Sequence, residues 1–582
     1  MVSAKDNAVQ SQHNDGYIIP LLSVTSSAID YQNQLDSFKV VSQLLRNQYS
    51  VFWVAESFQT KGIEILPGSF IVPQNSSAAF KKLLFDICRK YQLTPIYTVL
   101  PPKLAVYTLQ SPKVAIYCGD RTFDGPAGFV AICDHLGFDC DMINGVDIRN
   151  GILNRNGYNL VLIPGGMSSV QAYVIYPEGL TAIQDFVKRG NGYLGICAGA
   201  YLAADTDLGL NLVTDTLADC GAVGEVEVSP VKSDLPIFWG YNQSRFNLKY
   251  WAGPTFKPDS RILAKVEKIP DKWKKPELCQ QGCIMASDYE KGRLVLIGPH
   301  PESSTGLENF EGMPRLYGNI IFYLTAVEGK PSLQALQQYF ILKPKIPAKK
   351  KSGMTIAGSA KVAKLAERNL DMVKQIAALI GNVDNICARI RKQPGQGKLA
   401  WHECNFVWRM PSAKKYIQKL QEQLIEIKQI TATGKTARNK NRVLPPEKEV
   451  YLQLQKMQQE LPPVLASWQK LDTGMTEFEQ EFNQVSALDA ENKKASADLE
   501  KKENSVLKLA WWQLSVKEYI LSAEFIGGES WKYWKNLDDM TESSLKKDPK
   551  TGKPLNIIHA STPKGALWTI VQLHLELRRI LE

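Results

Sequence analysis

Long apolar segments and clustered cysteines are both missing from this 582-residue sequence. No apolar run approaches the roughly 18 residues that a membrane-spanning helix needs. The polar start MVSAKDNAVQSQHND also lacks the apolar core of a signal peptide. Ten cysteines spread over this length do not make a disulfide scaffold. These absences argue against a small secreted or membrane-spanning protein and predict a soluble, cytoplasmic one.

Histidine is scarce too, with six residues in the whole chain. The C-x3-C pair Cys279 and Cys283 has no second ligand pair at the spacing of a zinc site. We therefore expect no metal site and no cofactor.

The whole chain has a net charge of +10, and the excess of positive charge is confined to its second part. Residues 1–330 contain 29 Lys+Arg and 32 Asp+Glu, whereas residues 331–582 contain 40 and 27. Acidic residues are mixed with basic ones throughout the second part, which favours solvated helix faces over a nucleic-acid surface. We expect a basic carboxyl-terminal region that does not bind nucleic acid.

Composition and the pattern of apolar residues divide the chain into four parts. Residues 1–110 read as a small α/β module, and residues 111–330 alternate strand and helix patterns with glycine turns. A basic linker rich in Pro and Lys is expected over residues 331–354, because its prolines exclude a continuous helix. Residues 355–582 are rich in Lys, Gln, Glu and Leu, with few glycines.

Apolar residues three and four apart predict an all-α helical bundle or coiled coil in this last part. Such a seam runs from Val373 to Ile390 and another from Val464 to Val485. The runs are short, so an antiparallel bundle is favoured over an intermolecular coiled coil. Pro462 and Pro463 are expected to begin a helix.

The candidate catalytic residues lie in residues 111–330. Strand–helix alternation there predicts a parallel sheet with helices on both faces. Sites in such sheets form at the carboxyl ends of strands. Gly165 and Gly166 follow a predicted strand over residues 158–163, and Cys197 follows another over 192–196.

Gly195-Ile196-Cys197-Ala198-Gly199 has the G-x-nucleophile-x-G form of a nucleophile elbow, with cysteine in place of serine. The glycines are needed because the strand-to-helix turn is tight. The turn also places sulfur at the start of a helix, where free N–H groups favour the thiolate.

A cysteine nucleophile needs a base, and His300 is the one histidine that directly follows an apolar strand beside a carboxylate. That strand ends in Leu294-Val295-Leu296-Ile297. Glu302, two residues after His300, is placed to orient the imidazole and to stabilise its charged form.

The elbow, the Pro164-Gly165-Gly166 loop and the His300-Pro301-Glu302 segment together resemble a class I glutamine amidotransferase domain, over about residues 112–328. The resemblance implies a triad in which Cys197 is the nucleophile, His300 the general base and Glu302 its orienting partner. It also implies an oxyanion and substrate-binding site made by three backbone groups, those of Gly165, Gly166 and Ala198.

The elbow sequence GYLGICAGAY is closer to the domain of this type found at the amino terminus of some biotin-protein ligases. Glutamine-hydrolysing members usually have Leu and Gln where this chain has Ala198 and Tyr201. No G-R-G-R ligase signature follows, so biotin transfer is not predicted.

Two hypotheses follow. In the first, the triad performs hydrolysis or acyl transfer on a small-molecule amide, and the carboxyl-terminal helices bind a protein partner. In the alternative, the domain is a catalytically inactive scaffold or ligand-binding module that recruits a partner through those helices.

Overall fold

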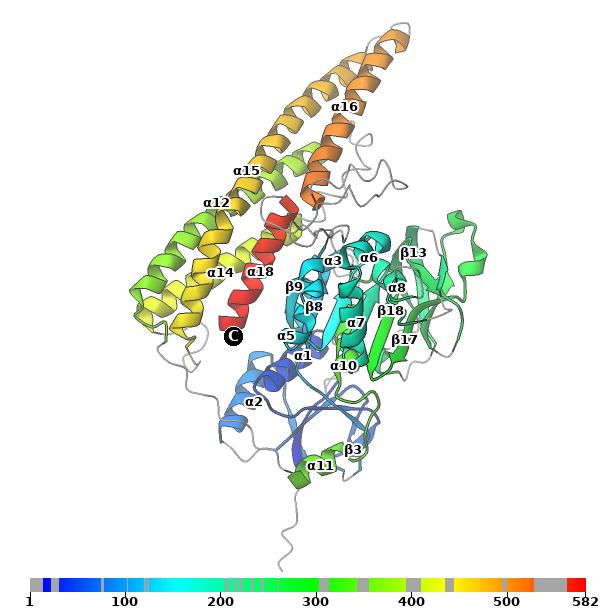
Figure 1. The fold of residues 1–582 in the computed structure, drawn as a ribbon, viewed down its shortest axis with the longest axis vertical. Helices are drawn as coiled ribbons and strands as arrows, with labels where there is room; N and C mark the ends of the chain where they lie inside the picture. The colour runs from blue at the N-terminus through cyan, green and yellow to red at the C-terminus, as the bar shows by residue number, and fades with distance from the viewer. Residues whose placement is uncertain are drawn as a thin grey trace, which may run out of the picture. The chain divides into compact units, whose positions relative to one another are not determined.

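The computed structural model describes a large part of the chain. The described residues are 14–21, 31–74, 78–101, 103–119, 122, 125–204, 209–213, 217–219, 223–231, 235–241, 245–259, 261–302, 313–342, 355–393, 410–434, 444–494, 500–527 and 563–581. They form two compact units (Figure 1). The first unit comprises residues 1–117, 128–140 and 147–349, and the second comprises 118–127, 141–146 and 350–582. Within these described ranges, no helix is both long and apolar enough to cross a bilayer.

The first unit begins with a five-stranded antiparallel sheet in the order β6-β1-β5-β2-β7. Its strands are β1 (Asp15–Ile19), β2 (Phe52–Val54), β5 (Phe70–Pro73), β6 (Ile96–Val99) and β7 (Val106–Thr108). Two amphipathic helices and a hairpin accompany it, namely α1 (Tyr31–Arg46), α2 (Ala78–Lys90), β3 (Phe58–Thr60) and β4 (Ile63–Ile65). The predicted small α/β module therefore forms.

Successive residues of these strands pack on opposite faces, because side chains alternate along a strand. On one face Ile18, Phe52 and Val54 share a core with Leu336 of α11 (Ala335–Leu342). Residues 335–342 were predicted to belong to the linker, and this is wrong. Their apolar side chains pack on the sheet instead, and burial outweighs the proline signal that follows them. Residues 343–354 of the predicted linker lie outside the described residues.

Most of an 11-stranded mixed sheet lies in the first unit, in the order β14-β13-β16-β17-β18-β11-β10-β8-β9, with β12 and β15 attached through β17. Residues 141–143, the end of β9, belong to the second unit. Its strands are β8 (Lys113–Tyr117), β9 (Asp139–Ile143), β10 (Leu160–Ile163), β11 (Gly192–Ile196), β12 (Leu217–Asp219), β13 (Val223–Pro230), β14 (Phe246–Trp251), β15 (Pro254–Phe256), β16 (Ile262–Lys268), β17 (Gly282–Tyr289) and β18 (Gly292–Ile297). The accompanying helices are α3 (Gly125–Leu136), α4 (Gly145–Arg149), α5 (Ile152–Arg155), α6 (Ser168–Ile175), α7 (Glu178–Lys188), α8 (Ala198–Ala203) and α10 (Met313–Thr325), with short 3-10 turns η1 (Pro236–Phe238), η2 (Asp271–Trp273) and η3 (Pro276–Leu278).

The predicted parallel sheet is the centre of this assembly, where β8, β10, β11 and β18 run parallel. Helices cover both of its faces, as predicted. Gly192 of β11 packs against Leu324 of α10, whereas Gly292 of β18 packs on the opposite side against Val187 of α7. The strands β13 to β17 extend the sheet in antiparallel fashion, an extension that the sequence patterns did not predict.

The second unit is dominated by five helices, α12 (Ala360–Arg391), α14 (Met410–Thr433), α15 (Glu447–Asn492), α16 (Glu500–Gly527) and α18 (Pro563–Leu581). α14 runs antiparallel to α12, since Lys414 pairs with Asp384 and Lys428 pairs with Glu367. α16 runs antiparallel to α15, since Lys517 pairs with Glu481 and Leu521 faces Gly474. α12 and α15 run parallel, since Asn369 bonds to Leu454 and Arg389 to Glu479. The predicted seams from Val373 and from Val464 are buried in this bundle.

Pro462 and Pro463 do not begin a helix, and that prediction is wrong. Both lie inside α15, which starts at Glu447 directly after Pro446. A proline inside a helix removes one backbone hydrogen bond and crowds the preceding turn. Leu461 and Val464 on either side are fully buried, so packing of this face outweighs the local cost.

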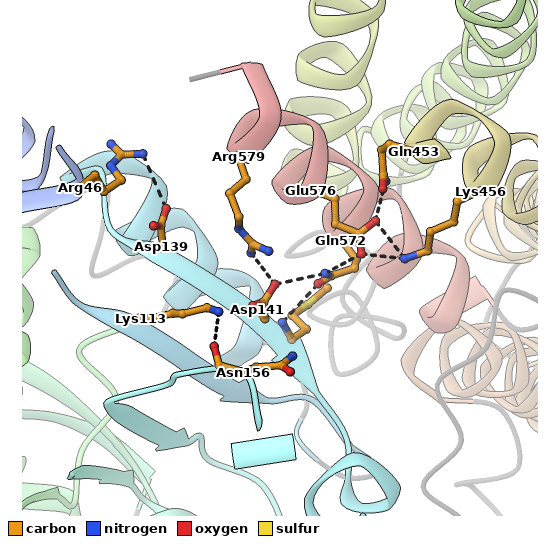
Figure 2. A network of polar contacts seen from close by, with 11 residues as sticks. Arg46, Lys113, Asp139, Asp141, Asn156, Gln453, Lys456, Gln572, Glu576 and Arg579 are labelled. Atoms are coloured by element: carbon orange, nitrogen blue, oxygen red, sulfur yellow. Dashed lines mark hydrogen bonds and ion pairs between the residues drawn. The ribbon is translucent and has the colours of Figure 1, made fainter. Parts of the chain in front are cut away.

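Polar contacts add to apolar packing in the second unit (Figure 2). Asp141 accepts hydrogen bonds from Arg579 and Gln572. One turn of α18 from Gln572, Glu576 pairs with Lys456 of α15 at 2.7 Å. Carboxylates withdrawn from water need such cationic partners, so the network satisfies charges that would otherwise destabilise the unit.

The bundle offers a matched pair of tryptophans. Trp468 on α15 is fully buried, whereas Trp512 on α16 is 63 % exposed. We expect Trp468→Ala to lower the free energy of unfolding by about 3–5 kcal/mol because it leaves a cavity, and Trp512→Ala to change it by less than about 0.5 kcal/mol. Denaturant unfolding followed by circular dichroism measures both, and equal losses would contradict this burial pattern.

Candidate active site

Cys197 stands at a strained turn between β11 and α8. Its backbone has φ 48° and ψ −104°, a conformation that is costly for a residue with a Cβ. The flanking glycines are required by close approach: a Cβ on Gly195 would lie 2.5 Å from the carbonyl oxygen of Gly199, and one on Gly199 would lie 2.0 Å from that of Ile163. The Tyr193 hydroxyl also donates to the Gly199 carbonyl at 2.7 Å. The local geometry is that of a nucleophile elbow.

Parallel pairing of β11 with β18 brings the segment that contains His300 and Glu302 to the elbow. Ile196 pairs with Ile297, and the Cys197 amide donates to the Ile297 carbonyl at 2.8 Å. His300 follows three residues later, and its own amide donates to the Lys249 carbonyl at 2.7 Å. Cys197 and His300 therefore meet because two neighbouring strands end at the same edge of the sheet.

Glu302 contacts the imidazole of His300. Its Oε1 lies 2.8 Å from Nδ1 of His300, and only 3 % of the carboxylate side chain is exposed, against 17 % of His300. Burial by itself lowers the pKa of His300, but the negative charges of Glu302 and Cys197, and hydrogen bonds to both, raise it well above its usual value. Together these neighbours favour the charged, imidazolium form of His300.

The Gly165 loop touches the same histidine. A Cβ on Gly165 would lie 2.3 Å from Cε1 of His300, so only glycine fits beside this ring. Gly166 has φ 151°, a conformation that side chains other than glycine rarely adopt. Ala198, the first residue of α8, is buried beside Cys197. The structure thus brings Cys197, His300, Glu302 and Gly165 together, with Gly166 and Ala198 adjacent in the chain.

Sequence reasoning missed two contributors to the site. The Cys197 thiol donates to the Trp251 carbonyl at 3.6 Å, and a Cβ on Gly253 would lie 3.5 Å from Cα of Cys197. The end of β14 therefore covers the sulfur. Tyr317 of α10 donates to Oε2 of Glu302 at 3.4 Å. Neither contact has a local sequence signal, because each joins segments far apart in the chain.

No metal site emerges among the residues whose placement is described: no three His, Cys, Asp or Glu side chains are grouped to hold an ion. In the same ranges Cys283 is a buried free thiol, and Cys279 is a half-buried one.

The parallel core, the elbow and the His–Glu segment define an amidotransferase-like α/β domain. Residues 155–207, which include the elbow, match the family described as "Biotin-protein ligase, N terminal". This match confirms the predicted resemblance to that type of domain. It covers a small part of the chain.

Other similarities are more distant. An uncharacterized protein of Chlamydia muridarum is 25 % identical over 183 residues, which are 28 % of this chain and 66 % of that protein, just under two thirds of its length. A cytoplasmic protein of Salmonella typhimurium is 14 % identical, with a TM-score of 0.27 over 37 % of this chain and 99 % of that one. A glutamine amidotransferase of Thermotoga maritima is 18 % identical, with a TM-score of 0.25 over 40 % of this chain and 98 % of that one.

Gly165→Ala tests the packing of the loop on His300. The added methyl group clashes with the ring at 2.3 Å, and the ring must move relative to Glu302. We expect a lower melting temperature, corresponding to about 1–3 kcal/mol. Gly329→Ala is the control, because its Cβ would meet Arg293 at an ordinary 3.5 Å. Equal melting temperatures for the two variants would contradict the contact.

His300→Gln tests the ion pair through pH. The folded-state pKa of His300 lies above its ordinary value of 6.5, so the pair contributes stability fully below about pH 6.5 and loses it as pH rises through the folded-state pKa. We expect the difference in melting temperature between wild type and His300→Gln to be larger at pH 6 than at pH 9.5. A difference independent of pH would show that His300 is not charged in the folded protein.

Proposed function

We propose that the amidotransferase-like domain is a cysteine-dependent amidohydrolase or acyl transferase that uses a Cys197–His300–Glu302 triad on a small-molecule amide. The supporting observation is the 2.8 Å pairing of His300 with the buried Glu302, directly beside Cys197 on its strained turn. Nucleophile, base and orienting carboxylate in contact are the arrangement that activates a thiol. A cytoplasmic location and a protein partner for the carboxyl-terminal helices belong to the same proposal.

The reaction would proceed in two halves. With the proton already on His300, the Cys197 thiolate attacks the amide carbon to form a C–S bond and a tetrahedral oxyanion. Backbone N–H groups of Gly165, Gly166 and Ala198 would stabilise that charge. The C–N bond then breaks, the nitrogen takes the proton from His300, and an amine leaves a thioester on the enzyme.

Water or an acceptor amine completes the cycle. His300 takes a proton from the attacking molecule, whose oxygen or nitrogen bonds to the thioester carbon. The C–S bond then breaks, and the Cys197 thiolate is left beside the protonated His300. The products are an acid, or a new amide, and the free enzyme. Glu302 stays ionised throughout and keeps the imidazole oriented.

One observation favours the alternative, a catalytically inactive scaffold. Cys197 is only 5 % exposed, and its thiol donates to the Trp251 carbonyl rather than to an open pocket. A substrate reaches the sulfur only if the end of β14 moves. In the alternative this segment stays closed, and the domain serves to recruit a partner through the bundle.

Site-resolved alkylation separates the two. Iodoacetamide is added to the whole protein at pH 7, and mass spectrometry follows Cys197 and Cys279 separately. Cys279 is the internal reference because it is only half-buried, whereas Cys197 is buried. For an activated nucleophile we expect Cys197 to react at least about 10-fold faster than Cys279 despite its burial, and His300→Gln to remove that advantage.

The opposite result is equally clear. If Cys197 reacts more slowly than Cys279, and His300→Gln changes neither rate, the triad does not activate the thiol. The scaffold reading would then be favoured.

A further inference from the structure

Glu302 uses both of its carboxylate oxygens. Oε1 pairs with Nδ1 of His300 at 2.8 Å, and Oε2 accepts a hydrogen bond from the Tyr317 hydroxyl at 3.4 Å. The side chain is almost completely withdrawn from water. A buried carboxylate takes its orientation from its hydrogen-bond partners, because water does not compete for its lone pairs.

Tyr317 is itself rigidly held. Its side chain is fully buried, and its ring meets Phe129 of α3 edge-on, with centroids 5.5 Å apart. Burial, and then the charge of Glu302, raise the pKa of Tyr317 well above its usual value. The hydroxyl therefore remains a hydrogen-bond donor at neutral pH.

Contacts with neighbouring segments fix the positions of Tyr317 and Glu302 relative to each other. On α10, Arg315 donates to the Trp239 carbonyl at 3.2 Å, and Asn319 donates to the same oxygen at 2.8 Å. These bonds anchor α10 to the segment after η1. On α3, a Cβ on Gly128 would lie 2.6 Å from the Glu302 carbonyl oxygen, so the helix backbone packs directly on Glu302.

We propose that Tyr317 is a positioning residue that holds the Glu302 carboxylate against His300. It touches neither Cys197 nor the reacting atoms and acts through Glu302. The inference rests on the proposed function for its catalytic meaning. The contact itself can be tested whether or not Cys197 reacts.

Titration of His300 provides that test in the full-length protein. The six histidines are labelled with carbon-13 and followed by NMR from pH 5 to pH 10, and His300 is assigned by the signal lost in His300→Gln. Tyr317→Phe keeps the ring against Phe129 and removes only the hydroxyl. Freed from one of its two partners, the carboxylate is expected to turn away from Nδ1. The titration midpoint of His300 should then fall by about 0.4 to 1 pH unit, the size of one hydrogen bond.

Two further variants make the outcome specific. Tyr323→Phe is the matched control, because it makes the same chemical change on the same helix, where the ring faces Arg293; its midpoint should equal that of wild type. In a Glu302→Gln background, Tyr317→Phe should cause no further shift, since the effect passes through Glu302. An unchanged or higher midpoint in Tyr317→Phe, or an equal shift in both backgrounds, would overturn the proposal.

The alkylation rate of Cys197 in the same variants distinguishes a failure of this inference from a failure of the proposed function. A slow Cys197 in the wild type counts against the catalytic role, while the midpoint of His300 still decides whether Tyr317 holds Glu302. With a fast wild-type Cys197, Tyr317→Phe should slow alkylation about 2- to 10-fold. A fast wild type with an equally fast Tyr317→Phe would overturn the positioning role alone.

Discussion

The parallel pairing of β11 with β18 is the constraint on which the candidate site depends. Cys197 and His300 are about a hundred residues apart in the chain, and they meet because Ile196 and Ile297 occupy the same register. The amide of Cys197 continues this ladder by donating to the Ile297 carbonyl. A shift of register would separate the sulfur from the imidazole, so the site is as well defined as the centre of the sheet itself.

Several features around this edge cost stability and have no packing benefit of their own. Cys197 adopts a left-handed backbone that a side chain disfavours. Glu302 buries a carboxylate, and removing either partner of a buried ion pair costs several kcal/mol, commonly about 3–5. Strain and a buried charge pair at one point are characteristic of functional sites, because folding alone does not require them. The strained backbone and the buried charge pair together mark this edge of the sheet as the candidate site.

The sequence predicted the features that depend on short-range patterns. The elbow is a five-residue motif, and His300 was identified because an apolar strand ends just before it. What it did not predict depends on long-range packing: Tyr317 reaches Glu302 only because α10 returns across the sheet. The same reason explains α11, whose apolar residues find a partner in the first sheet, and Pro462, which stays helical because its neighbours are buried. At these positions, burial against distant parts of the chain outweighs the local secondary-structure propensity.

The contact between Gly165 and His300 also links two positions that are far apart in the chain. Because a Cβ at position 165 would occupy the space of the imidazole, a larger residue there is compatible only with a smaller or displaced side chain at position 300. The two positions should therefore vary together among related sequences. A relative with alanine or serine at the first position would have lost the histidine from its place beside the sulfur. Glycine at this loop position thus offers a simple criterion for separating relatives that keep a histidine beside the cysteine from relatives that keep only the fold.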